Sequence, residues 1–118
     1  MRLTEITYTE ARPIDSYGPG FFRIGGVVLR GPVLITPWDA GPWGGLEDTA
    51  APITYAGRID VLFVGMGAEI AHVPQAFRAA IEAAGIGVEV MNSPAACRTY
   101  NVLLSEGRRV AAALLPVA

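Results

Sequence analysis

The sequence predicts an α/β domain, in which helices connect the strands of one sheet and a β-hairpin precedes them. The main observation is a change of rhythm along the chain: short β-rich runs with turns come first, and apolar runs alternating with two helical patterns follow. The chain has 118 residues, of which 52% are hydrophobic and 17% charged, which is enough apolar material for one ordinary core. We therefore expect a single α/β domain over residues 1–118.

The first half contains the predicted β-hairpin. Two β-rich runs, residues 21–24 and 27–30, are separated by the glycine pair 25–26, which suits a tight turn that needs positive φ. The Gly-Pro pair at 31–32 ends the second run. Residues 33–35 are then either a further strand or a continuation of the same strand past a bulge.

Residues 36–45 are expected to form a loop, because prolines and glycines are frequent there. Both tryptophans of the chain, Trp38 and Trp43, fall in this segment. They either form a patch that binds a partner or cover the hydrophobic core.

The second half begins with a strand that should be buried on both faces. Residues 60–64 form a mostly apolar run that leads into a Gly-Met-Gly turn at 65–67. A helix follows, with Pro74 at its first position and Gly85 as its C-terminal stop. Its apolar face has helical spacing and consists of Phe77, Ala80, Ile81 and Ala84.

Two further strands, residues 88–91 and 109–115, flank a second helix. This helix is expected to have Ser93 as its N-cap, with a proline just inside, and to close at Gly107. Its apolar face consists of Ala96, Tyr100, Leu103 and Leu104. The order strand, helix, strand, helix, strand predicts crossovers between parallel strands, with the hairpin extending or covering the sheet.

Composition argues against several classes of function. All nine basic residues are arginine, and eleven acidic residues give a net charge of −2, so no basic face for nucleic acid is expected. The single cysteine, Cys97, allows no internal disulfide and suits a reducing compartment. The first residues lack the apolar run of a signal peptide, and Pro116 interrupts the longest apolar stretch, 110–118. We expect a cytoplasmic protein without membrane insertion.

Two loops follow strands whose carboxyl ends should meet, where ligands of open α/β sheets usually bind. One is Gly65-Met66-Gly67, and the other leads through Ser93 into the second helix. If the two strands are adjacent and parallel, free N–H groups at the helix start and the nearby Arg98 would suit a small anion.

Each of these features also has a structural interpretation. The glycine loop is a tight turn at the end of a strand as readily as a ligand loop. Arg98 can instead form a salt bridge with a carboxylate such as Asp60 or Glu89.

The second helix carries the other candidate residues: Cys97, Thr99, Tyr100 and Asn101. Cys97 either packs in the core or, near a helix N-terminus, acts as a nucleophile. Tyr100 and Asn101 are expected to be largely buried and to serve the fold before any ligand, and the Tyr100 hydroxyl then needs a hydrogen-bond partner. The only histidine, His72, is expected at the surface near the first helix. We predict no metal, no cofactor and no catalytic set.

The stretch from Asn92 to Asn101 resembles the C-terminal signature of a family of small α/β proteins catalogued as a domain of unknown function, whose mitochondrial member is NADH dehydrogenase (complex I) assembly factor three. The resemblance continues through residues 106–108 and 110–115, and it extends back through 17–21, the Trp43 loop and 60–67. It implies a three-layer α/β fold with a mixed sheet and two main helices. It also allows the last strand to run antiparallel to its neighbours, so the direction of this strand is left open.

The resemblance bears on function as well, because it implies a role in respiratory complex I assembly for the mitochondrial branch. The family commonly has Gly-Thr-Gly where this chain has Met66 between the glycines, so a hydroxyl that could contact a ligand is missing. We therefore predict a non-enzymatic binding or assembly factor with a protein partner, linked to the biogenesis of respiratory complexes or membrane proteins. The alternative is an enzyme or a sensor of a small anionic ligand that uses the cleft at the second helix N-terminus. The oligomeric state is not predicted.

Overall fold

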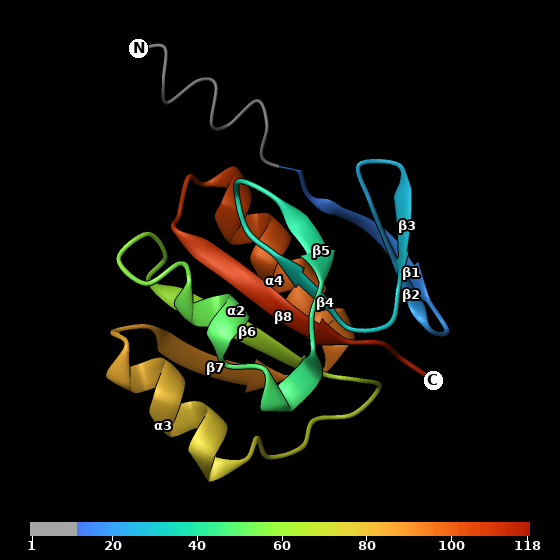
Figure 1. The fold of residues 1–118 in the computed structure, drawn as a ribbon. Coiled ribbons are helices and arrows are strands. Elements are labelled where there is room, and N and C mark those ends of the chain that lie inside the picture. The colour runs from blue at the N-terminus through green and yellow to red at the C-terminus, as the bar shows by residue number, and fades with distance from the viewer. Residues whose placement is uncertain (1–11) are drawn as a thin grey trace, which may run out of the picture.

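The computed structural model describes residues 12–118, which form two β-sheets and four helices (Figure 1). The smaller sheet is antiparallel with the order β1-β2-β3, and its strands are β1 (Ile14–Gly18), β2 (Phe21–Ile24) and β3 (Val27–Arg30). The larger sheet has the order β5-β4-β8-β6-β7, and its strands are β4 (Val33–Ile35), β5 (Ala40–Pro42), β6 (Val61–Met66), β7 (Gly87–Met91) and β8 (Val110–Leu115).

Helices cover both faces of the larger sheet, so the fold is the three-layer α/β arrangement that was predicted. The helices are η1 (Gly45–Glu47), α2 (Ala50–Ile53), α3 (Gln75–Ala83) and α4 (Ser93–Ser105). One core joins α4 and the smaller sheet to one face, and a second core joins α3, Trp43 and the α2 region to the other. None of these helices is long and apolar enough to span a bilayer.

The order of the central strands follows from the handedness of crossover connections. β6 and β7 are parallel neighbours joined through α3, and β8 lies parallel to β6 on its other side, reached through α4. Because such connections are right-handed, moving first to one side of β6 and then to the other places α3 and α4 on opposite faces. The two loops at the carboxyl ends of β6 and β7 therefore lie at the same edge of the sheet.

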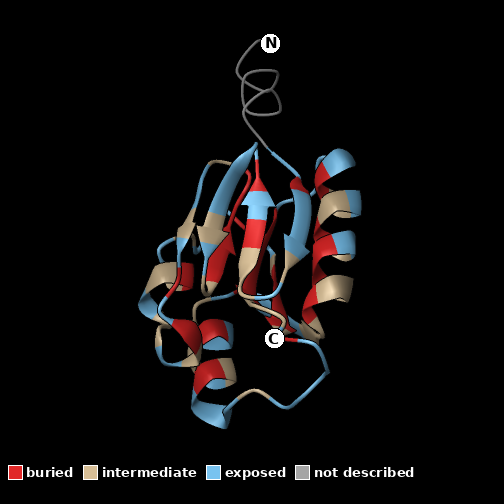
Figure 2. Cartoon of the chain, turned by 90° about the vertical axis from the view of Figure 1, so that its right-hand side faces the viewer, coloured by how far each residue is buried: buried red, intermediate tan, exposed pale blue. Residues whose placement is uncertain are grey.

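Side chains of the central strands alternate between the two cores, as the strand period of two requires. Phe63 and Ala112 face α4, whereas Leu62, Ala111 and Ala113 face α3. Figure 2 shows the resulting pattern, with buried residues on the inner sides of the helices and exposed residues on their outer sides. The small alanines of β8 leave room for helices to pack closely on both faces of this central strand.

The predicted hairpin is confirmed as β2 and β3. Gly25 and Gly26 have φ of 59° and 81°, and the Gly26 N–H donates to the Asp15 carboxylate at 3.0 Å. β1, which was not predicted, pairs with β2 from the other side. Of the two possibilities for residues 33–35, the separate strand is found, because β4 belongs to the larger sheet.

Three expectations need correction. Residues 36–45 are not all loop, because the Thr36 N–H donates to the Asp39 carbonyl at 2.8 Å and turns the chain back to pair as β5. Pro74 is the N-cap of α3 rather than its first residue. β8 is parallel to β6 and antiparallel to β4, so the sheet is mixed, and neither a wholly parallel nor a wholly antiparallel last strand is right.

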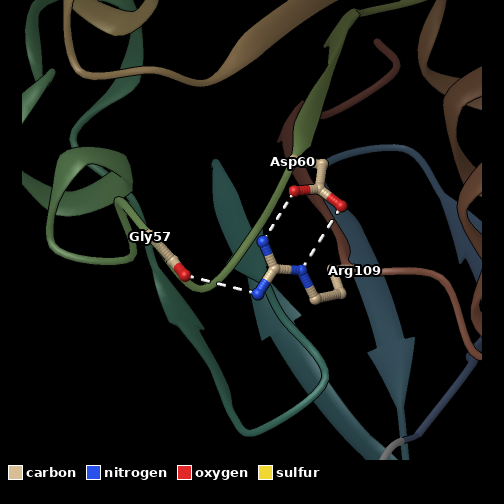
Figure 3. Close-up of polar contacts among 3 residues, drawn as sticks. All are labelled: Gly57, Asp60 and Arg109. Atoms are coloured by element: carbon tan, nitrogen blue, oxygen red, sulfur yellow. Dashed lines mark hydrogen bonds and ion pairs between the residues drawn. The ribbon is translucent and has the colours of Figure 1, made fainter.

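An ion pair joins the amino ends of β6 and β8, opposite the candidate site (Figure 3). The Arg109 guanidinium donates to both carboxylate oxygens of Asp60, at 2.7 and 3.3 Å, and to the Gly57 carbonyl at 3.3 Å. The hydrogen bond from Arg109 holds the pKa of Asp60 below its usual value. Both side chains are solvent-exposed, so this contact positions the strand ends and adds little stability.

Candidate functional site

Ser93 joins three elements at the carboxyl edge of the larger sheet. Its hydroxyl accepts from the Gly67 N–H at 2.9 Å and donates to the Leu115 carbonyl through a short hydrogen bond. Its own N–H donates to the Gly67 carbonyl at 2.7 Å. The exit of β6, the start of α4 and the end of β8 are thus fastened at one fully buried side chain.

The glycines of the Gly-Met-Gly turn have separate steric reasons. A Cβ on Gly65 would lie 2.7 Å from the Ser93 hydroxyl oxygen and 2.9 Å from a methyl group of Leu114, closer than real side chains approach. Gly67 has φ of 93°, a conformation that favours glycine. The turn therefore has the geometry of a tight strand exit held against α4.

The N-terminus of α4 is capped by protein groups. Asn92, not the expected Ser93, is the N-cap, and its side chain accepts from the Ala95 N–H at 2.8 Å. The Ala96 N–H donates to the Asn92 carbonyl at 3.0 Å, and Pro94 has no N–H. With the Ser93 N–H bonded to Gly67, an anion at this helix start would have to displace an existing hydrogen bond.

Cys97 and Tyr100 lie in the core between α4 and the smaller sheet. Cys97 is 4% exposed, and burial raises the pKa of its thiol to about 11, while the charge of Arg98 opposes this shift. Tyr100 is fully buried, and burial likewise raises the pKa of its hydroxyl. The hydroxyl that was expected to find a partner has none among the described residues. Both groups are therefore protonated and neutral near pH 7.

Asn101 attaches the smaller sheet to α4. Its amide oxygen accepts from the Ile14 N–H at 2.8 Å, and its amide nitrogen donates to the Ile14 carbonyl at 2.9 Å. The side chain thus pairs with the backbone of β1 much as a neighbouring strand would. Asn101 is half-buried and contributes to the fold, in agreement with the expected structural role.

Two predicted site residues of α4 are at least partly exposed to solvent. Arg98 is exposed and Thr99 is half-buried. Among residues 12–118, Arg98 forms no ion pair, and one of its two expected partners, Asp60, is bound by Arg109 instead. Arg98 is therefore the one charged group of the predicted site that remains accessible in this part of the chain.

Met66 and Trp43 do not join this group, because both pack in the core on the opposite face of the sheet. Trp43 is 4% exposed, contacts Phe77 edge-on at 6.1 Å between ring centroids, and donates its indole N–H to the Asp48 carbonyl at 3.0 Å. Of its two possible roles, covering the core is the one that the geometry supports.

The sequence did not predict a second polar cluster on the β4–β5 side. Trp38 stacks on Tyr55 at 6.0 Å, and the Arg58 guanidinium lies 4.1 Å from the Trp38 ring centre. The Tyr55 hydroxyl donates to the Asp39 carboxylate at 2.8 Å, and burial and this hydrogen bond raise the pKa of Tyr55. The Thr36 hydroxyl also donates to Asp39 at 3.0 Å. These contacts pair the hydroxyls of Thr36 and Tyr55 with Asp39 and hold the β4–β5 turn against the segment after α2.

Among the described residues, the predicted site shows neither a metal-ligand cluster nor an accessible nucleophile at Cys97 or Ser93. Within residues 12–118, no three His, Cys, Asp or Glu side chains lie close enough to hold a metal ion. Cys97 and Ser93 are buried, and the hydrogen bonds of Ser93 go to backbone groups rather than to a general base.

Residues 14–115 match the family described as a protein of unknown function (DUF498/DUF598). The chain belongs to this family. An uncharacterised protein of Rhodobacter capsulatus is 54% identical over 110 residues, which cover 93% of this chain and 89% of that protein. The resemblance noted in the sequence is thus confirmed for almost the whole described chain.

Several animal relatives are named as assembly factors of NADH dehydrogenase. The zebrafish NADH dehydrogenase [ubiquinone] 1 alpha subcomplex assembly factor 3 is 34% identical over 110 residues, covering 87% of this chain and 63% of that protein. A crystal structure of a Bartonella henselae protein, described as an outer membrane protein, has a TM-score of 0.83 at 35% identity and covers 92% of this chain and 97% of that one.

Replacing Gly65 with alanine tests the packing at Ser93. The added methyl group must push Ser93 or Leu114 aside, so we expect Gly65→Ala to lower the free energy of unfolding by about 1 to 3 kcal/mol. Urea denaturation measures the change. Gly41→Ala is the matched control, because a Cβ there has no atom within 4 Å and should be neutral or slightly stabilising. Equal stability of the two variants would contradict the steric account.

Tyr100→Phe tests the cost of the unpaired hydroxyl. Removing a buried polar group without a hydrogen bond should raise the free energy of unfolding by about 1 kcal/mol, whereas Tyr100→Ala should lower it by about 3 to 5 kcal/mol through the cavity it leaves. Both changes are measured by urea denaturation. A clear loss of stability in Tyr100→Phe would show that the hydroxyl has a hydrogen-bond partner in solution.

Proposed function

We propose that this protein is a non-enzymatic, protein-binding assembly factor that acts in the biogenesis of a respiratory NADH dehydrogenase. The observation that carries the proposal is that the potentially reactive or ligand-binding side chains of the predicted site serve the fold. These side chains are Ser93, Cys97, Tyr100 and Asn101. Without an available nucleophile or general base there, binding is the function that the geometry favours.

The names of the relatives suggest which process this binding role belongs to. The zebrafish protein named as complex I assembly factor 3 shares 34% identity across 87% of this chain. The chain spans 63% of that protein's length, so the common part is the α/β unit described above. We infer that this unit carries a protein-binding activity that this chain shares with the animal assembly factors.

We also propose that the protein acts in the cytoplasm. Its one cysteine, Cys97, is a buried thiol, which suits a reducing compartment. An assembly factor there would meet the parts of the dehydrogenase that face the cytoplasm.

Binding of a small anion is the second candidate function, and the exposed Arg98 is the observation that favours it. Its charge lies one turn into α4 and pairs with no carboxylate of the described residues. The α4 N–H groups near it are already bonded, so the anion site would rest mainly on this side chain.

Deletion of the gene in the source organism tests the assembly role. We expect less assembled NADH dehydrogenase in the membranes, measured by native gel electrophoresis with in-gel NADH oxidation, and recovery when the chain is restored. Succinate dehydrogenase activity, the control for general respiratory damage, should not change. Unchanged levels of assembled NADH dehydrogenase after deletion would exclude the proposed role.

Arg98→Ala separates the two candidate functions. Because Arg98 is exposed and pairs with no described carboxylate, the variant should keep the wild-type melting temperature. If binding proteins is the function and Arg98 lies outside that surface, the variant restores dehydrogenase assembly in the deletion strain. Phosphate and citrate, titrated by calorimetry against wild type and variant, test the anion site, which requires binding that the variant loses.

A further inference from the structure

β7 is an edge strand, and its register shows which backbone groups face outward. The Gly87 N–H donates to the Asp60 carbonyl at 2.9 Å, so Gly87 and every second residue after it direct their backbone groups toward β6. Val88 and Val90 therefore direct theirs away from the sheet. The Arg78 side chain confirms this direction, since it donates to the outward carbonyl of Val88 at 3.4 Å.

The outward N–H and carbonyl of Val90 form no hydrogen bond with any described residue. The loop between β6 and α3, which is yellow-green in Figure 1, also has unpaired backbone groups. Backbone hydrogen bonds hold its two ends, Gly67 and Pro74, but the backbone of residues 68–73 makes none within residues 12–118. Two segments with unpaired backbone groups thus lie near each other.

A hollow of about 510 Å³ separates these two segments. It is lined by Ile70, Ala71, His72, Val73, Gln75, Arg78 and Val90. Ile70 is 67% exposed, the highest value among the exposed large hydrophobic residues of the described chain. An apolar side chain held open beside unpaired backbone groups suits a binding surface better than a packed edge.

Arg78 is the charged side chain that lines the hollow. The ionisable lining residues are His72 and Arg78, and no Asp or Glu lines it. Arg78 pairs with Glu82 at 3.2 Å through Nη1, which leaves Nη2 and Nε without a partner among the described residues. A bound segment would therefore gain from an acidic group near Arg78.

The opposite edge of the same sheet, β5, is protected against pairing with another strand, so the two edges differ. In β5 the residues that bond to β4 are Asp39, Gly41 and Trp43, so Ala40 and Pro42 face outward. Proline at an outward position has no N–H to offer and blocks pairing with another strand. β7 has valine at the equivalent outward positions.

We propose that the β7 edge and the facing loop, residues 68–73, bind an extended segment of a protein partner, which adds to the sheet as a further strand. The segment pairs its backbone with Val90, places an apolar side chain against Ile70 and Val73, and carries an acidic residue next to Arg78. The unpaired outward N–H and carbonyl of Val90 are satisfied best by another extended backbone. This proposal rests on the proposed function in that it supplies the surface for the protein partner.

A direct test uses a short synthetic peptide of alternating threonine and valine that ends in glutamate and is blocked at both termini. Titrated into the ¹⁵N-labelled chain, it should shift the amide signals of residues 70–73 and 88–90 and slow hydrogen exchange at the Val90 amide. Shifts confined to other residues, or no saturable shift, would overturn the proposal.

Two variants remove different parts of the surface. Val90→Pro deletes the outward N–H without breaking a bond to β6, and Ile70→Asp replaces the exposed apolar side chain in a loop that packs little. Each should weaken peptide binding by about tenfold or more. Val102→Asp is the matched control for Ile70→Asp, because Val102 is also exposed, at 55%, but lies on α4. Equal affinity of Ile70→Asp and Val102→Asp would contradict the proposed surface.

The acidic residue of the segment is tested separately. The same peptide ending in lysine should bind about threefold more weakly than the glutamate peptide, and Arg78→Ala should abolish this difference. A difference that persists in Arg78→Ala would place the acidic contact elsewhere and remove that part of the proposal.

The last experiment distinguishes failure of this proposal from failure of the proposed function. The deletion strain is complemented with wild type, Ile70→Asp or Val102→Asp, and assembled NADH dehydrogenase is measured. Loss of assembly with Ile70→Asp alone supports the β7 surface. Full recovery with Ile70→Asp overturns the surface and leaves the assembly role standing. If deletion itself has no effect, the assembly role fails, and the peptide titration alone decides the β7 surface.

Discussion

The hydrogen bonds of Ser93 are the contact on which the rest of the structure depends. The Ser93 hydroxyl accepts a hydrogen bond from the Gly67 N–H at the exit of β6 and donates one to the Leu115 carbonyl at the end of β8. Ser93 is also the first residue of α4. These elements come from three separate parts of the chain, and their relative positions fix which face each helix covers. Gly65 is the steric condition for this contact, since any side chain there would hold α4 away from the sheet.

These hydrogen bonds explain why the Gly-Met-Gly turn at 65–67, which resembles a ligand loop in the sequence, instead connects β6 to α4 and β8. Polar groups placed at a buried junction must be satisfied, and here they satisfy one another. The polar groups at the α4 N-terminus are likewise satisfied by protein groups, because Asn92 caps the helix and the Ser93 N–H bonds to Gly67. An exposed surface with unpaired backbone groups lies elsewhere, at the outer edge of β7. The sequence pattern did not indicate it.

Much of the fold could be predicted from local sequence. The glycine pair at 25–26 defines the hairpin, and the spacing of Ala96, Tyr100 and Leu104 gives the buried face of α4 correctly. The missed features depend on contacts distant in sequence. The choice between Asn92 and Ser93 as cap is decided by the neighbouring Gly67, and the direction of β8 relative to β4 depends on how both chain halves meet. The open edge of β7 is invisible in sequence, because Val88 and Val90 look like any buried strand until the neighbours of that strand are known.

The two hydrogen bonds between Asn101 and the Ile14 backbone have a consequence for the order in which the protein folds. The apolar side of the smaller sheet, with Ile14, Phe22 and Ile24, packs on residues of α4 that leave the ribosome well after these strands. Contacts of such long sequence separation form slowly, and a sheet of three short strands has little stability alone. The N-terminal strands must therefore wait, with their apolar side uncovered, until α4 is made. The first described part of the chain to be synthesised is among the last that can reach its native packing.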